Sequence, residues 1–215
     1  MGITEAVKER VSETISAELA PSGFSLKKGS LVTQLSSGFT GSIGLNFSLN
    51  RTDGLIGLNP IASIVCRQIE DALVDLTEGA ERRPLPSLST ALGYLTPENR
   101  FLEWLFDPNA PPTGHILESK RIAELIVLYG IPFLREHSSI SAIVGCLEES
   151  RFSFVERADY HLPVAYRLLG EGQKAEALVK RRLSDFDKRR DIAANQYRRF
   201  AGNFLSDVAR IKQNT

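Results

Sequence analysis

The first twenty residues carry apolar side chains at every fourth position, namely at Val7, Val11, Ile15 and Leu19. This spacing places the four side chains on one stripe of an amphipathic helix. A proline and a glycine follow at positions 21 and 23, and these residue types end helices. The pattern predicts a first helix that packs along its apolar stripe and stops near residue 20.

From Phe24 onward the apolar positions follow a two-residue period, which is typical of strands. Apolar and polar residues alternate in three runs between glycine and serine clusters: 24–36, 41–50 and 54–60. The runs predict three strands of a meander. Pro60 is expected to begin the next helix, because a proline at the first helical position loses no intrahelical hydrogen bond. A charged, proline-containing connection at 78–90 then leads to a fourth predicted strand at 90–95.

The segment DPNAPPTG contains three prolines and cannot continue any regular element, so we place a boundary near residue 110. Beyond it the pattern is helical. The segment 119–130 is apolar almost all round, which predicts a buried helix ended by Gly130 and Pro132.

Three further helical segments follow. A short helix is expected at 139–150, and another is expected to open at Pro163 and close at Gly170. An unbroken helix over the last segment, 173–212, would be about 60 Å long. We therefore predict a break near LSDFD, where Ser184 or Asp185 would cap a new helix.

These elements predict an α+β fold, with an N-terminal antiparallel sheet and its helices followed by an all-helical C-terminal half. The expected subdomains are 1–110, which is α+β, and 111–215, which is helical. A chain of 215 residues can also pack the two as one domain.

Composition places the chain among globular proteins, with 42% hydrophobic residues, 24% charged residues and a formal net charge of zero. Cys66 and Cys146 lie in apolar segments, so we expect two buried, reduced thiols rather than a disulfide. The sequence has no pattern of a signal peptide or of a membrane-spanning helix. We therefore expect a cytoplasmic protein without a membrane partner.

Candidate catalytic residues are sparse. His115, His137 and His161 lie apart from one another and match no HExxH, CxxC or GxSxG motif, so surface or capping roles are expected. The acidic pairs 70–71 and 148–149 are sequence neighbours whose side chains diverge on a helix, which predicts solvated faces. The run GFTGSIG, at 38–44, is interpreted as a hairpin turn rather than a phosphate-binding loop. We expect no enzyme activity, no metal and no cofactor.

Charge is asymmetric along the chain. Residues 171–215 hold eleven Lys and Arg against six Asp and Glu. The candidate partner-binding residues are the arginines of this segment: Arg181, Arg182, Arg189, Arg190, Arg198 and Arg199. Aspartates interleave with them, and Asp185 could pair with Arg189 one helical turn later. An internally paired, solvated face is favoured over a nucleic-acid site, so no nucleic-acid partner is expected.

The stretch LPVAYRLLGEGQKAEALVKRRL, at 162–183, resembles one tetratricopeptide hairpin. The resemblance rests on the type and spacing of Ala165, Leu168, Gly172 and Ala177, whereas the later positions, with Arg181 and Ser184, depart from the pattern. No second copy follows at the expected offset, and a stable array needs about three repeats. The stretch therefore predicts a helical hairpin of a compact domain.

The stretch 19–49 resembles small bacterial domains of the toxin-immunity type. The residues that carry the resemblance are Gly23, Phe24, Lys27, Lys28, Gly29, Gln34 and Ser36. The resemblance implies a cytoplasmic protein that acts by binding a protein partner, with an immunity protein that neutralises a toxin as its particular form. Two alternatives remain open: a nucleic-acid-associated protein using the basic C-terminal helices, and an enzyme whose site no linear motif reveals.

Overall fold

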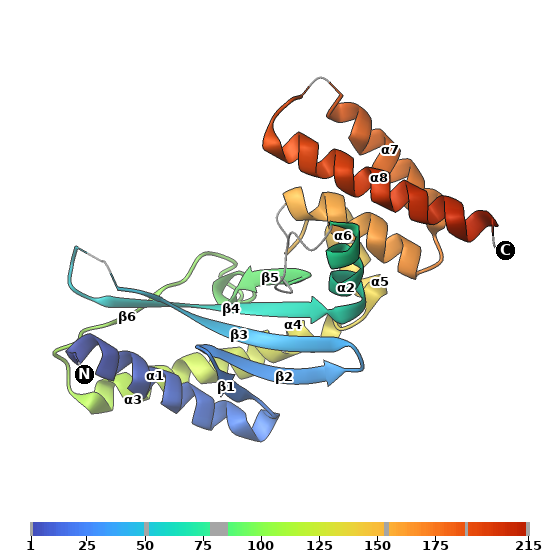
Figure 1. Ribbon diagram of the computed structural model, residues 1–215. Helices are drawn as coiled ribbons and strands as arrows, with labels where there is room; N and C mark the ends of the chain where they lie inside the picture. The colour runs from blue at the N-terminus through green and yellow to red at the C-terminus, as the bar shows by residue number, and fades with distance from the viewer. Residues whose placement is uncertain (1, 50–51, 78–85, 153–154, 188, 214–215) are drawn as a thin grey trace. The chain divides into compact units, whose positions relative to one another are not determined.

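A computed structural model describes residues 2–49, 52–77, 86–152, 155–187 and 189–213 of the chain (Figure 1). Contacts divide the chain into two compact units. The first consists of Met1–Ile64 and Ser89–Ser138, and the second of Val65–Leu88 and Ser139–Thr215. These units do not coincide with the expected 1–110 and 111–215 division, because 65–88 groups with the C-terminal helices and 111–138 groups with the sheet.

An antiparallel sheet of six strands confirms the expected α+β class. The strands are β1 (Ser25–Lys27), β2 (Ser30–Ser36), β3 (Phe39–Ser48), β4 (Ile56–Cys66), β5 (Leu88–Ala91) and β6 (Trp104–Phe106). Their order is β1-β2-β3-β4-β5, and β6 also pairs with β4. The predicted strand at 24–36 is in fact a hairpin, since Lys28 and Gly29 turn the chain between β1 and β2 with φ angles of 50° and 80°.

Helices of the first unit cover one face of the sheet (Figure 1). They are α1 (Ile3–Leu19), α3 (Pro112–Leu125), the π-helix η3 (Ile126–Gly130) and α4 (Ile131–Glu136), with short 3₁₀ turns η1 (Ala20–Ser22) and η2 (Leu92–Tyr94). Alternate residues of β3 are buried beneath these helices, among them Ile43, which lies opposite Leu31 of β2. The stripe predicted for α1 is confirmed, because all four of its apolar residues are buried.

The expectation that Gly130 and Pro132 end a helix is wrong. The chain stays helical through α3, η3 and α4, and the π-helical turn immediately precedes α4, where Pro132 lies in the first turn. A proline lacks the N–H for the ordinary helical bond, and a π-turn is one way for a helix to accommodate this loss. This helical stretch is also not buried all round, since Val127 and Leu128 are exposed.

Pro60 does not begin a helix, contrary to the sequence prediction. It lies within β4, and α2 starts only at Arg67. Strand β6 pairs with β4 over Ile56–Leu58, so Pro60 follows the paired residues and its missing N–H interrupts none of those pairs. Tertiary pairing therefore overrides the local helix signal at this proline.

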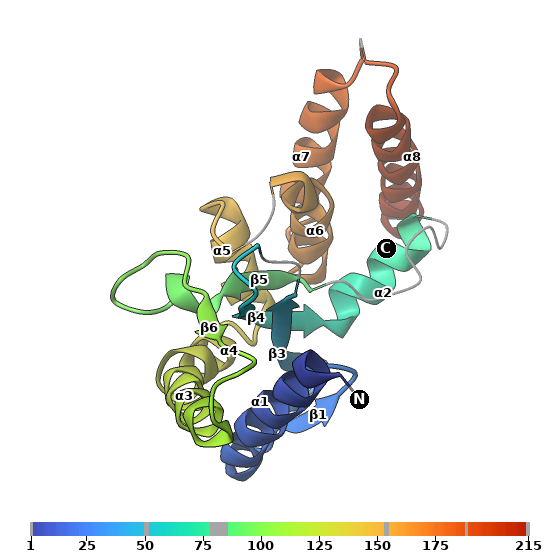
Figure 2. The ribbon, with the colours of Figure 1, turned by 90° about the vertical axis from the view of Figure 1, so that its left-hand side faces the viewer.

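The second unit is helical. Its helices are α2 (Arg67–Leu76), α5 (Ile140–Glu148), α6 (Val155–Leu168), α7 (Gly172–Asp185) and α8 (Ile192–Gln213). Helices α7 and α8 lie side by side (Figure 2). An aromatic cluster holds α6 and α8 together, in which Tyr160 meets Tyr197 and Phe200 edge to face at 5.3 and 4.9 Å between ring centroids.

In the second unit, two predicted helix boundaries are confirmed and two are wrong. Gly170 closes α6 with a φ of 80°, and the long C-terminal segment breaks after Asp185. Pro163, however, lies inside α6, which begins eight residues earlier. The N-terminal cap of α8 is Asp191 rather than Ser184 or Asp185, because its carboxylate accepts the N–H of Ala194 at 2.9 Å.

Both cysteines are buried, and neither forms a disulfide, as expected. Cys66 ends β4 and Cys146 lies in α5. Among the helices over the described residues, none is both long and apolar enough to cross a bilayer.

Candidate protein-binding surface

The six candidate arginines lie on and between α7 and α8. Arg181 and Arg182 belong to α7, Arg198 and Arg199 to α8, and the other two to the connection between these helices. The structure thus brings all six into one helical hairpin of the second unit, but it gives them different roles.

Four of the six arginines bind within the hairpin and its neighbours. Arg182 forms ion pairs with Asp159 at 2.8 Å and with Asp185 at 3.3 Å. Arg189 pairs with Asp191 at 2.8 Å, and its hydrogen bond lowers the pKa of that carboxyl. The expected pair between Asp185 and Arg189 is therefore replaced by two other pairs, although the face is internally paired as predicted.

Arg190 and Arg198 stabilise the connection itself. The Arg190 guanidinium donates to the backbone carbonyl of Asp187 at 2.8 Å. The Arg198 guanidinium donates to the carbonyl oxygens of Phe186 and Arg189, which lie at the end of α7 and in the connection. These arginines donate to backbone carbonyl groups just beyond the end of α7 and thereby hold the connection between α7 and α8.

Arg181 and Arg199 remain available. Both are exposed, and over the described part of the chain neither guanidinium has an ion pair or hydrogen bond. Two separate cations are a much smaller binding surface than six arginines. Most arginines of the basic segment therefore stabilise the α7–α8 hairpin and do not form a surface patch of unpaired positive charge.

A buried polar cluster in the second unit was missed by the sequence analysis. Glu70 Oε1 accepts hydrogen bonds from the Ser87 hydroxyl at 2.8 Å and from His161 Nε2 at 3.0 Å. The backbone N–H of Cys66 donates to Ser87 Oγ at 3.0 Å, and His161 Nδ1 lies 3.0 Å from the carbonyl oxygen of Arg157. The predicted solvated face at Glu70 and the predicted surface role of His161 are therefore wrong.

The order of groups in this cluster differs from that of a catalytic triad. In a triad, histidine lies between the hydroxyl and the carboxylate and takes the hydroxyl proton. Here the carboxylate of Glu70 lies between Ser87 and His161, so the hydroxyl proton points to Glu70. His161 has an oxygen atom at hydrogen-bond distance from each of its two ring nitrogens. The arrangement is that of a buried carboxyl group in contact with a hydroxyl and an imidazole ring.

The other two histidines also have structural contacts. His115 is buried, with Nδ1 at 3.2 Å from the Arg10 guanidinium and Nε2 at 2.8 Å from the carbonyl oxygen of Asp107. His137 caps the end of α4, as a capping role predicted, with Nδ1 at 2.9 Å from the carbonyl oxygen of Phe133. Within the described residues, no three His, Cys, Asp or Glu side chains gather into a group that could hold a metal ion.

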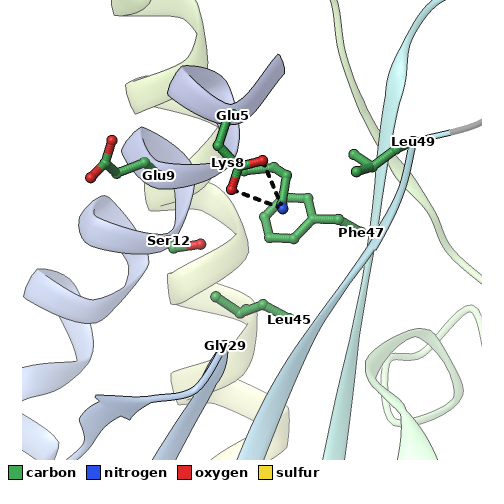
Figure 3. Close-up of a pocket in the computed structure, with 8 residues that line it drawn as sticks. All are labelled: Glu5, Lys8, Glu9, Ser12, Gly29, Leu45, Phe47 and Leu49. Carbon is green, nitrogen blue, oxygen red and sulfur yellow. Dashed lines mark hydrogen bonds and ion pairs between the residues drawn. The ribbon is translucent and has the colours of Figure 1, made fainter. Parts of the chain in front are cut away.

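A groove in the first unit lies between α1 and β3 (Figure 3). One wall is formed by polar side chains of α1, and the opposite side by Leu45, Phe47 and Leu49 from β3 and the residue that follows it. Gly29, in the turn between β1 and β2, lies at one end of the groove. Leu49 is 43% exposed and Phe47 is half-buried, whereas Leu45 is buried, so the accessible apolar part of the groove is at its Phe47–Leu49 end.

The α1 wall is acidic. Glu5, Glu9 and Glu13 follow one another at four-residue spacing and are exposed, and the first two line the groove. Lys8 is bound to both carboxylate oxygens of Glu5 at 3.2 Å, and its Nζ lies 5.9 Å from the centre of the Phe47 ring (Figure 3). Among described residues, Glu9 has no cationic partner. The groove thus combines an apolar side with a carboxylate wall.

The sequence analysis did not single out this groove. Its signal is the alternation of Leu45, Phe47 and Leu49 beside the four-residue repeat of glutamates in the first helix. Comparison with protein-family models, with curated proteins and with solved structures found no match to this chain.

Proposed function

We propose that the chain is a non-enzymatic protein-binding domain and that the groove between α1 and β3 is its binding surface. The observation that carries the proposal is that exposed Leu49 and half-buried Phe47 share one groove with the charged side chains of α1. Protein interfaces combine an apolar centre with a polar rim in this way.

The resemblance of residues 19–49 to toxin-immunity domains implies that the partner is a toxin, which the chain would neutralise by binding. That stretch supplies Gly29, Leu45, Phe47 and Leu49, which are half of the residues that line the groove. Neutralisation by binding needs a surface that competes for the partner's own site, and it needs no catalytic group on this chain. The proposal therefore places recognition in the part of the chain that carries the resemblance.

The test is site-specific photo-crosslinking in the source cells. A photoreactive amino acid at position 49 should crosslink one discrete protein, whereas the same amino acid at position 26 should not. Leu26 is a matched control, because it is exposed to a similar extent (39%) in the same sheet and does not line the groove.

The crosslinked protein would then be purified and its affinity measured directly. We expect Leu49→Ser to weaken binding about tenfold, the effect of one central interface side chain, and Leu26→Ser to leave it unchanged. Equal effects of the two variants would refute the groove as the binding surface. For a toxin partner, co-expression of the native chain should restore growth and co-expression of Leu49→Ser should not.

A further inference from the structure

Strand β3 has an open edge at the groove. The pairing of β2 with β3 ends where Ser30 lies opposite Gly44, and the N–H of Leu45 then donates to the carbonyl oxygen of Gly29 at 3.2 Å. Strand β3 continues to Ser48, while the other chain segment turns away into β1. Over the residues that the structure describes, no strand lies beside 46–48 on this side of β3.

The backbone groups of Phe47 face this open edge. Along an antiparallel strand, the N–H and C=O of alternate residues point to the same side. Leu45 bonds toward the β2 side, so Phe47, two residues later, points its N–H and C=O to that side as well. An open edge of this kind is a template for one more strand.

The charged side chains that line the groove, Glu5, Lys8 and Glu9, sum to a net charge of −1, which favours a cationic partner. Lys8 already places its ammonium group by the Phe47 ring while bound to Glu5, which shows that this part of the groove accommodates a positive charge. Glu9 lies on the same wall and has no cationic partner among the described residues. A lysine or arginine can cover the apolar side with its methylene groups and reach a carboxylate with its charged end.

We infer that the groove takes an extended, basic segment of a partner protein, which adds to the edge of β3 as a short strand. This inference rests on the proposed function and specifies its mode of binding. The segment pairs with Phe47 through backbone hydrogen bonds and directs every second side chain toward α1. Long basic side chains at those positions contact Glu9 and cover Phe47.

The experiment uses a capped six-residue peptide in which arginine and valine alternate, titrated into the full-length protein and followed by amide chemical shifts. The expected result is a set of shifts confined to residues 5–12 and 45–49. A peptide with glutamate in place of arginine should bind far more weakly. Methylating the peptide nitrogens on one strand edge removes backbone donors and should weaken binding about fivefold or more, whereas methylation on the other edge should not.

Two glutamate variants provide the matched comparison. Glu9→Gln should weaken peptide binding about fivefold, the upper range for an exposed charge pair, and Glu13→Gln should not change it. Both glutamates are exposed on α1, one turn apart, and only Glu9 lines the groove. Equal losses of peptide affinity in the two variants would show non-specific charge attraction and would overturn the inference.

The outcomes separate this inference from the proposed function. A partner that crosslinks at position 49, together with peptide binding that is insensitive to methylation on either edge, would leave the groove as the binding surface and refute strand addition. Failure of the peptide to shift residues 45–49 would also refute strand addition. Failure of crosslinking and of the Leu49→Ser comparison would refute the proposed function itself.

Discussion

Glu70→Ala is expected to destabilise the second unit strongly, although Glu70 looks like a solvated helix residue in the sequence. Glu70 is 5% exposed, and His161, to which it binds, is 4% exposed. The substitution leaves the Ser87 hydroxyl and the His161 ring without their acceptor in a site that water does not reach.

The magnitude follows from the burial of the pair. Each buried polar group left without its hydrogen-bond partner costs about 1–3 kcal/mol in the free energy of unfolding, and this substitution leaves two such groups, Ser87 and His161. With a urea dependence of about 2 kcal/mol per molar, a loss of about 4 kcal/mol lowers the unfolding midpoint by about 2 M. Glu70→Gln retains one oxygen acceptor and loses the charge, so its cost should be smaller, about 1–3 kcal/mol.

Urea unfolding followed by far-ultraviolet circular dichroism measures this loss, since the second unit is helical. Asp71→Ala is the matched control, because Asp71 is the next residue of α2 and its side chain is 72% exposed. The midpoint of the control should stay close to that of the native protein. Equal midpoints for the Glu70 and Asp71 variants would refute the buried pair. The double variant with His161→Ala should cost less than the sum of the two single changes, because the groups are coupled.

Three further predictions concern single side chains or small groups of them. Cys66 and Cys146 should react slowly with a thiol reagent in the native protein, because both are buried and burial raises the pKa of the Cys66 thiol. A labelling rate in the native protein equal to that in urea would contradict this prediction. Tyr197→Phe should raise stability by about 1 kcal/mol in thermal or urea unfolding, because its buried hydroxyl has no hydrogen-bond partner among the described residues, and a loss of stability would indicate a bound partner. No appreciable binding to mixed-sequence DNA or RNA is expected in an anisotropy titration at physiological salt. Salt-sensitive binding that is lost on changing the two available arginines, Arg181 and Arg199, to alanine would instead favour a nucleic-acid function.

Local patterns predicted elements well where a single periodicity dominated. The four-residue stripe of α1 and the two-residue alternation of β3 are both buried as expected. The two helix starts predicted from prolines were wrong. A proline is compatible with the first turn of a helix, but it does not show whether the segment instead pairs as a strand or continues an earlier helix. Pro60 lies in a strand paired with a distant segment, and Pro163 lies in the middle of a helix.

Contacts between distant residues explain what the sequence could not predict about the sites. Glu70 and His161 are 91 positions apart, and neither lies in a recognisable motif. The edge of β3 is open beyond Leu45 because β2 begins only at Ser30, opposite Gly44, which depends on strand register rather than on residue type. The arginines were recognisable as a group, but their partners at the end of α7 depend on the conformation of the connection between the helices.

The basic C-terminal segment and helix α1 differ in how their charged side chains are paired. Most of the six candidate arginines bind aspartates or backbone carbonyls of the second unit. On α1, by contrast, Glu9 and Glu13 repel each other across one helical turn, at a cost of about 0.2–0.5 kcal/mol, and no cation pairs with either among the described residues. A basic partner would relieve this repulsion at Glu9, beside an apolar side and an open strand edge. Electrostatics therefore favours a basic partner at the first unit. The peptide with glutamate in place of arginine tests directly whether the groove prefers a positive charge on its partner.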